Sequence, residues 1–195
     1  GWTGALAGVE NGLVLVLGTG IGSGIILNGK VYMGAHSAAG EVSNFVTDMA
    51  AMDPDSFTLK KIERLPEMPV WAGNSSATGL IFEYAKEKEM DLDGPMPTGE
   101  EIFAAYNARE PEAQHTLKVF ARRVAIGVLS LQSILDVEKV AIGGGISAAE
   151  ALLPAIRTEL DGIFARCPML PMLEPELVRC RYGNDANLIG ALKLF

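Results

Sequence analysis

The chain has 195 residues, of which 49% are hydrophobic, and this is ample for the buried core of a folded domain. Its 24 acidic residues outnumber the 16 basic ones, and the net charge of −8 opposes binding to nucleic acid or an anionic membrane surface, so a small-molecule partner is favoured. The two cysteines have no CxxC spacing and predict neither a zinc site nor a disulfide framework, and every apolar run falls short of the roughly 20 residues of a membrane helix, so we expect a cytoplasmic protein.

Three antiparallel strands are predicted near the start of the chain. Residues 13–17 form an uninterrupted Leu/Val run bounded by glycines, which is typical of a strand buried on both faces. A second strand is expected at 24–27 and a third at 30–32. Asn28 and Gly29 between them indicate a two-residue hairpin turn, because both central positions of that turn need a positive φ.

The middle of the chain is predicted to be helical after an irregular excursion over 34–70. Asn74 or Ser75 is expected to cap a helix, and the capping-box pattern at 98–101 opens a shorter one. A long helix that begins at Pro111 carries one apolar stripe, which should pack on the sheet. The stripe consists of Leu117, Phe120, Val124, Val128, Leu131 and Leu135.

The last third of the chain alternates strands and helices. The stretch VEKVAIGGGIS, 137–147, is predicted to be a strand that runs into a glycine corner, followed by a helix over 148–165. A final strand at 177–181 leads through 183–185 into a terminal helix. This order implies an α/β fold in which helices pack on a mixed sheet.

The glycine-rich corner GTGIG at 18–22 fits neither of two common phosphate motifs. The dinucleotide fingerprint GxGxxG is not met, because Ser23 or Ile25 stands where the last glycine should be. The stretch 24–30 spells GxxxxGK, but Val31 follows in place of Ser or Thr and the intervening residues are typical of a strand. What is left is a strand–turn–strand corner.

Two interpretations of this corner stay open on the residues alone. Its backbone N–H groups can hold anionic oxygens, or its glycines only let a bent hairpin pack closely. A second corner, Gly143–Gly145, follows a strand and precedes a helix, at the end of a strand where α/β proteins tend to bind ligands. The pair of corners favours a nucleotide spread between them.

Three stretches of the sequence resemble one family. VLGTGIGSGIILNGKVYMGAHSAAGEVS, KVAIGGGIS and GNDANLIGAL are similar, in this order, to motifs of the ROK proteins (repressors, open reading frames and kinases), which are bacterial sugar kinases and sugar-sensing regulators. The resemblance implies an actin-like ATPase (ribonuclease H-like) fold with a mixed sheet of about five strands. It also implies that 1–195 is a single domain, the C-terminal lobe of such a protein.

The resemblance assigns candidate binding residues and cofactors. It implies ATP and Mg²⁺ as cofactors, with the first glycine corner at the β- and γ-phosphates and the second beside the adenosine. It also implies a sugar site in which the carboxylate of Glu41 accepts hydrogen bonds from sugar hydroxyls. The implied ATP-binding residues are Gly18, Thr19, Gly20, Gly22, Gly144 and Gly145, and the sugar-binding residues are Glu41, Asn44 and His36.

The chain departs from the family pattern in three places. Ser43 and Asn44 replace the glycine and histidine of the family's G-E-[IV]-G-H sequence. The cysteine-rich zinc motif would lie between residues 44 and 78, where the chain has neither Cys nor His, so no metal site is expected. The lobe that carries the catalytic Asp would precede Gly1, so no catalytic residue is expected here. Asn184 and Asp185 match the Asn-Asp dipeptide of the motif that carries the catalytic Asp in the family. At this position they are expected to cap the last helix instead.

The implied activity is the transfer of the ATP γ-phosphoryl group to a hexose hydroxyl. We expect the chain to be inactive without the lobe that carries the catalytic Asp, and the intact protein to be a homodimer that binds ATP and a sugar. The alternative is a sugar-binding transcriptional repressor of the same family, with its DNA-binding helices upstream. The long apolar stripe at 117–135 is expected to be core and not a dimer interface.

Overall fold

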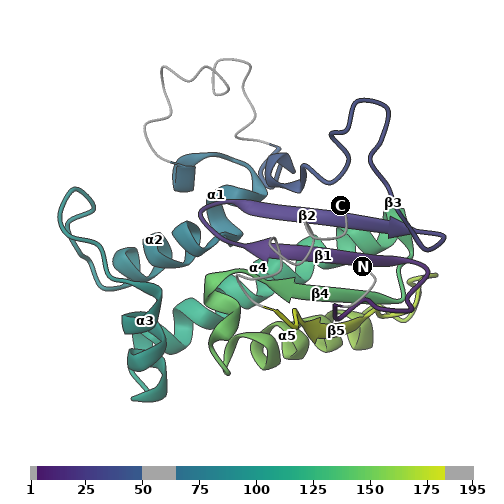
Figure 1. Cartoon of the computed structure of the whole chain (residues 1–195). Coiled ribbons are helices and arrows are strands. Elements are labelled where there is room, and N and C mark those ends of the chain that lie inside the picture. The colour runs from purple at the N-terminus through teal and green to yellow at the C-terminus, as the bar shows by residue number, and fades with distance from the viewer. Residues whose placement is uncertain (1–3, 50–64, 183–195) are drawn as a thin grey trace.

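A computed structural model describes residues 4–49 and 65–182, which contain a mixed five-stranded sheet (Figure 1). The strands are β1 (Gly12–Leu17), β2 (Ile21–Leu27), β3 (Lys30–Val31), β4 (Lys139–Gly143) and β5 (Glu176–Arg179). Their order across the sheet is β3-β2-β1-β4-β5. The pairs β1–β2 and β2–β3 are antiparallel, whereas β1–β4 and β4–β5 are parallel. The predicted mixed sheet is confirmed.

Two tight connections shape the N-terminal hairpins. Leu17 pairs with Ile21, so the three residues between them form the corner of the first hairpin. The second turn has Asn28 at φ 52° and Gly29 at φ 72°, which confirms the predicted two-residue turn. β2 begins three residues before the expected strand start, and β3 ends at Val31, one residue before the expected end.

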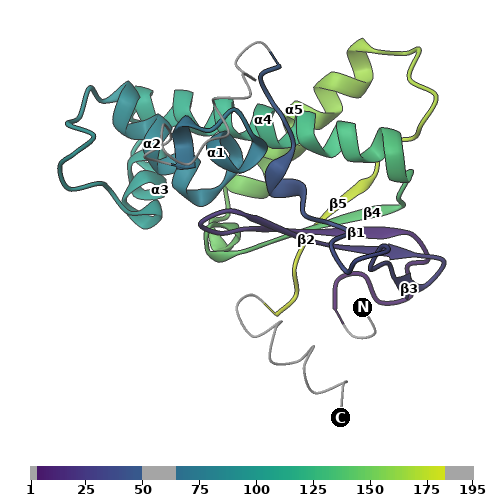
Figure 2. The same cartoon turned by 90° about the horizontal axis from the view of Figure 1, so that it is seen from above.

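All five α-helices of the described part lie on one face of the sheet (Figure 2). They are α1 (Trp71–Ser75), α2 (Ala77–Glu87), α3 (Gly99–Asn107), α4 (Pro111–Leu135) and α5 (Leu152–Arg166). Short 3₁₀ helices, η1 (Val42–Asn44), η3 (Leu65–Glu67) and η4 (Gly145–Ala148), lie in the connections. No helix within 4–49 or 65–182 is both long and apolar enough to cross a membrane.

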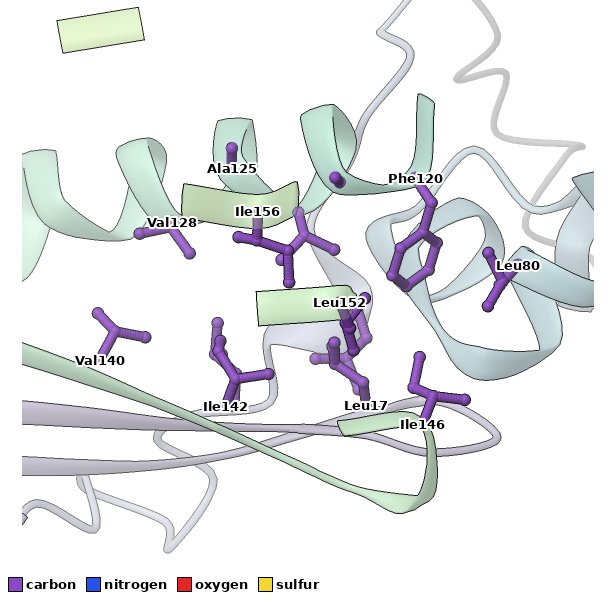
Figure 3. Close-up of a cluster of buried hydrophobic side chains, with 14 of the residues drawn as sticks. Leu17, Leu80, Phe120, Ala125, Val128, Val140, Ile142, Ile146, Leu152 and Ile156 are labelled. Carbon is purple, nitrogen blue, oxygen red and sulfur yellow. The ribbon is translucent and has the colours of Figure 1, made fainter. Parts of the chain in front are cut away.

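The main core fills the space between the sheet and the helices α4 and α5. Figure 3 shows Leu17 of β1 and Val140 and Ile142 of β4 directed toward the side chains of these two helices. The predicted stripe of α4 is confirmed as core, because five of its six residues are at most 3% exposed and the last is partly buried. Burial of this stripe stabilises α4, which is continuous over 25 residues.

β1 is not buried on both faces, so that prediction is wrong. Leu13, Leu15 and Leu17 point toward the helices and are 0% exposed, whereas Val16 on the opposite face is 41% exposed. The reason is that the described helices cover a single face. A run of Leu and Val does not reveal this, because valine is equally compatible with a half-exposed strand face.

Two predicted helix starts are also wrong. The cap of α2 is Ser76, whose hydroxyl accepts a hydrogen bond from the Gly79 amide at 3.1 Å. Asn74 instead donates to the Thr47 hydroxyl at 3.0 Å, and it belongs with Ser75 to the preceding helix α1. The helix expected from residue 148 starts at Leu152, because η4 takes up the residues after the glycine corner.

The other predicted elements follow the structure within a few residues. α3 opens with the expected capping box and α4 with Pro111. The segment 34–49 is irregular apart from η1 and an isolated antiparallel bridge between Val46 and Val70. The last strand runs over Glu176–Arg179 where 177–181 was expected. The expected terminal helix and its caps at 183–185 lie outside the described residues, as does part of the excursion predicted over 34–70.

Candidate functional site

A cavity of about 800 Å³ lies at the carboxyl ends of the parallel strands β1 and β4. Gly18 and Thr19 of the first glycine corner and Gly145 of the second contribute to its wall. The described residues that line it are Leu17, Gly18, Thr19, Ala77, Thr98, Gly99, Glu100, Phe103, Ala104, Asn107, Gly145, Ile146, Ala148 and Ala149. The structure thus brings together two corners that are more than 120 residues apart in the sequence, at the sheet edge where α/β proteins bind ligands.

Gly144 is the residue that lets the two corners meet. It has a φ of +93°, and a Cβ at this position would overlap the backbone carbonyl group of Leu17. The end of β4 can therefore lie on the end of β1 only if residue 144 is glycine. Gly144 itself does not line the cavity, whereas Gly145 does, and nothing lies within 4 Å of a Cβ placed on Gly145.

The first corner is fixed by its own backbone and by helix α2. The Gly18 amide donates to the Gly20 carbonyl at 3.0 Å and, with a longer contact of 3.2 Å, to the Val16 carbonyl. The Gly18 carbonyl accepts a hydrogen bond from the Ala77 amide at 2.8 Å. Since Ala77 is the first residue of α2, this bond places the N-terminus of α2 at the cavity.

Helix α3 forms the opposite wall of the cavity. Its capping box joins the Thr98 hydroxyl to the Glu101 amide at 3.2 Å and the Glu101 carboxylate to the Thr98 amide at 2.7 Å. The Glu101 carboxylate also accepts a hydrogen bond from the Thr98 hydroxyl at 3.0 Å, and the bonds it accepts from the Thr98 amide and then this hydroxyl lower the pKa of Glu101. With both α2 and α3 starting at the cavity, two helix N-termini favour an anionic group there.

The remaining lining is largely apolar. Phe103 and Ile146 supply buried apolar surface, and Asn107 and the two threonines supply polar groups. Glu100 is the sole ionisable side chain among the described lining residues. An apolar wall with a few polar groups and an amide-rich end suits a ligand that has one flat apolar part and one anionic part.

The predicted sugar residues lie on the loop between β3 and α1. Glu41, Asn44 and His36 are exposed, and none of them lines the 800 Å³ cavity. The loop is tied to β2 by the Ser23 hydroxyl, which donates to the Gly40 carbonyl at 2.6 Å, and by Ser43. The loop is thus fixed against the strand that follows the first glycine corner.

Two further predicted residues, Gly20 and Gly22, do not line the cavity. A Cβ on Gly20 would come within 3.4 Å of the Ser43 hydroxyl oxygen, and one on Gly22 would face Val16 at 3.7 Å. Sequence reasoning in turn missed the whole α3 wall of the cavity. The capping box revealed where α3 starts, but no sequence signal reveals that α3 stands across from the glycine corner.

Within the described ranges no group of three or more His, Cys, Asp or Glu residues could hold a metal ion. The zinc motif of the family has no Cys or His to support it between residues 44 and 78. The expected capping role of Asn184 and Asp185 lies outside the described residues.

Solved structures share this fold. A ROK family protein from Streptococcus pneumoniae in complex with sucrose aligns with a TM-score of 0.78 and 24% identity, over 96% of this chain and 58% of that one. A ROK family glucokinase from Streptomyces griseus in complex with glucose and AMPPNP aligns with a TM-score of 0.76 and 23% identity, over 96% and 61%. A ROK family transcriptional regulator aligns with a TM-score of 0.72 and 20% identity, over 97% and 46%. The fold is the predicted actin-like ATPase fold.

Curated relatives are similar over the whole chain. A β-glucoside kinase of Klebsiella pneumoniae is 31% identical over 100% of this chain and 58% of its own length. A glucokinase of Halalkalibacterium halodurans is 30% identical over 97% of this chain and 57% of its own length. The chain thus spans less than three fifths of the length of these two curated relatives. The sequence profile of the ROK family covers residues 1–195, and the chain therefore belongs to the ROK family.

Proposed function

We propose that this chain is the C-terminal, nucleotide-binding lobe of an ATP-dependent sugar kinase, which transfers the γ-phosphoryl group of ATP to a hexose hydroxyl. One observation carries the proposal: the two glycine corners share a single cavity with the N-termini of two helices. The names of the relatives, which are kinases of β-glucosides and of glucose, support the reaction and the sugar class.

In this proposal ATP spans the cavity from one corner to the other. The Thr19 amide and hydroxyl are proposed to hold the phosphates, because the Gly18 amide already donates to the Gly20 carbonyl. Gly18 lines the same wall, and no side chain there stands in the way. Gly145 leaves open space beside the ribose, and Phe103 and Ile146 give the adenine an apolar wall. The volume of about 800 Å³ lies within the range of small-molecule sites.

Glu41, Asn44 and His36 are proposed to bind the sugar. Their side chains are exposed on a loop that is hydrogen-bonded to β2 beside the phosphate corner. The carboxylate of Glu41 can accept hydrogen bonds from two hydroxyls, and the amide of Asn44 can both donate and accept. Exposed groups bind a sugar weakly on their own, so the proposed site is completed by residues that precede this chain.

The described residues fit ATP better than they fit a separate metal site. Near the corner they offer the Thr19 hydroxyl and the Glu100 carboxylate, and no cluster of metal ligands lies among them. Mg²⁺ is therefore proposed to arrive with ATP, where it offsets the negative charge of the phosphates. The proton of the sugar hydroxyl is proposed to pass to an Asp of the preceding lobe.

The test uses the intact protein, ATP and a panel of sugars: glucose, a β-glucoside, mannose and an N-acetylated hexosamine. We expect ADP release that depends on one of these sugars and a phosphorylated sugar as product. An intact protein that binds a sugar of the panel but phosphorylates none would contradict the proposal.

A sugar-binding repressor is the alternative, favoured by the ROK transcriptional regulator that shares the fold. The coding sequence upstream separates the two functions: an Asp-x-Gly-Gly-Thr motif supports the kinase, and a helix-turn-helix supports the repressor. A homodimer and a cytoplasmic location are proposed for either function, and sedimentation of the intact protein tests the dimer.

A further inference from the structure

The hydroxyl of Ser43 bonds both backbone groups of a single residue, Ile21. The Ile21 amide donates to Ser43 Oγ at 3.0 Å, and Ser43 Oγ donates to the Ile21 carbonyl at 2.7 Å. Ile21 is the first residue of β2 and directly follows the turn 18–20 of the first glycine corner, and Ser43 lies in η1, two residues after Glu41 and next to Asn44. One side chain thus joins the proposed phosphate corner to the proposed sugar loop.

This pair of hydrogen bonds takes the place of a missing neighbouring strand. β3 pairs with β2 only at Ile26 and Leu27, so the edge of β2 at Ile21 has no strand partner among the described elements. Ile21 is 3% exposed, and a buried amide or carbonyl without a partner is costly. Ser43 therefore satisfies two backbone groups that would otherwise lack a protein partner.

A second serine fixes the start of the same loop. Ser23 donates to the Gly40 carbonyl at 2.6 Å, and Gly40 has a φ of +92°. A Cβ on Gly40 would approach Ser23 Oγ to 2.7 Å. The segment from Gly40 to Asn44 is thus held to β2 at two places, and Ser43 is the one nearer to the glycine corner, within 3.4 Å of a Cβ placed on Gly20.

We infer that Ser43 is a positioning residue that holds the sugar loop against the phosphate corner, so that the sugar hydroxyl and the γ-phosphate meet in the reactive geometry. The inference rests on the proposed kinase function. A shift of the loop by a fraction of an ångström is enough to lower the rate of a transfer reaction.

The test replaces Ser43 in the intact protein and measures kcat and, separately, the KM for ATP and the KM for the sugar. For Ser43→Ala and Ser43→Gly we expect kcat to fall about tenfold, with the KM values for ATP and sugar changed by less than about threefold. Ser43→Thr keeps the hydroxyl and is expected to restore kcat to within about threefold of the wild type.

A matched control separates positioning from simple loss of stability. Tyr84→Phe removes another partly buried hydroxyl, which bonds Glu110 at 2.6 Å away from the glycine corner. It should lower the melting temperature as Ser43→Ala does, yet leave kcat within about twofold. If Ser43→Ala lowers the melting temperature but leaves kcat unchanged, the inference is overturned.

Hydrogen exchange tests the link independently of the activity. In Ser43→Ala the amides of Gly18–Ile21 should exchange faster, and in Tyr84→Phe they should not. Unchanged exchange at these amides overturns the inference whatever the activity. If Ser43→Ala exchanges faster at these amides but the wild-type protein phosphorylates no sugar, the link is supported and only the proposed function is contradicted.

Discussion

Two adjacent glycines at the end of β4 have opposite roles. Gly144 has a positive φ, and a Cβ there would overlap the carbonyl of Leu17, so this position is needed for the fold. Gly145 has open space beside it and lines the cavity, so this position is needed for the volume of the proposed ligand site. A run of three glycines in the sequence does not distinguish them, because the distinction depends on what lies nearby.

Alanine at each position should separate the two roles. Gly144→Ala should lower the free energy of unfolding by about 3 kcal/mol, from strain at positive φ and overlap with Leu17. Gly145→Ala should change it by less than about 0.5 kcal/mol. Urea denaturation measures both, and equal losses at the two positions would contradict this assignment.

The same Gly145→Ala variant tests the nucleotide site. It should weaken binding of AMPPNP to the intact protein about tenfold, because a methyl group then occupies space beside the ligand. Gly24→Ala is the control, since nothing lies within 4 Å of its Cβ and Gly24 does not line the cavity. Calorimetric titration gives both affinities, and unchanged affinity in Gly145→Ala would rule out a ligand at that wall.

Tyr84 links α2 to the start of α4 through an ionised partner. Its hydroxyl donates to Glu110 at 2.6 Å, and Lys88 pairs with the same carboxylate at 3.0 Å. Burial, followed by the bond to Glu110, raises the pKa of Tyr84 from 10.0 to about 12. The bonds from Tyr84 and then Lys88 lower the pKa of Glu110.

These pKa shifts predict how the difference in unfolding free energy between the wild type and Tyr84→Phe varies with pH. Because the folded pKa of Tyr84 is raised, its contribution is complete below about pH 10 and is lost as the pH rises through about 12. Because the folded pKa of Glu110 is lowered, the stabilisation from Glu110 is present above about pH 4.5 and is lost on further acidification. Denaturation of both proteins across this pH range should give the largest difference at neutral pH, and a constant difference would disprove the link.

At the scale of elements, α4 is the helix that organises the helical layer. It packs on α5, α2, α3 and α1, and it carries the apolar stripe that faces the sheet. It meets α1 at a glycine: a Cβ on Gly127 would overlap the Trp71 ring, and Trp71 Nε1 donates to the Arg123 carbonyl at 3.3 Å. Phe45 stacks on this indole at 6.0 Å between ring centres.

Gly127→Ala should therefore displace Trp71 and loosen α1. The expected loss is about 2 kcal/mol, because overlap with a buried ring outweighs the better helix propensity of alanine. Ser130→Ala is the control one turn along α4, since this exposed hydroxyl bonds only the Ile126 carbonyl of the same helix. Equal stability of the two variants in urea would contradict the close packing.

At the scale of the whole molecule, the cavity exists because three separate parts of the chain meet. The hairpin β1–β2, the helices α2 and α3 and the corner after β4 each contribute to the wall. All described α-helices lie on one face of the sheet (Figure 2). The cavity lies at the carboxyl end of the parallel strands β1 and β4. The proposed sugar residues lie beyond this cavity, on the loop beside β2.

Residues 1–195 expressed alone are expected to show no appreciable sugar phosphorylation. The proton acceptor is proposed to belong to a lobe outside these residues, and a general base typically contributes about 100- to 10,000-fold to the rate. The intact protein, assayed with the same sugar and ATP, is the positive control. Measurable sugar phosphorylation by the 195-residue chain would overturn this prediction.

The sequence by itself determined the features that depend on neighbouring residues. Asn28 and Gly29 specify their turn, the capping box starts α3, and the spacing of the apolar stripe specifies α4. The glycines that follow two predicted strands marked both glycine corners, since such a run is also a local pattern. These signals sufficed for the fold class, the strand order along the chain and part of the cavity wall.

The tertiary structure decided every feature that joins distant residues. The contact of Gly144 with Leu17, the α3 wall opposite Gly18 and the bond from Ser43 to Ile21 each connect separate elements. Which face of β1 is exposed was decided in the same way. The physical reason is that burial and close approach depend on what packs against a residue in space, and a single sequence gives each residue only its neighbours along the chain.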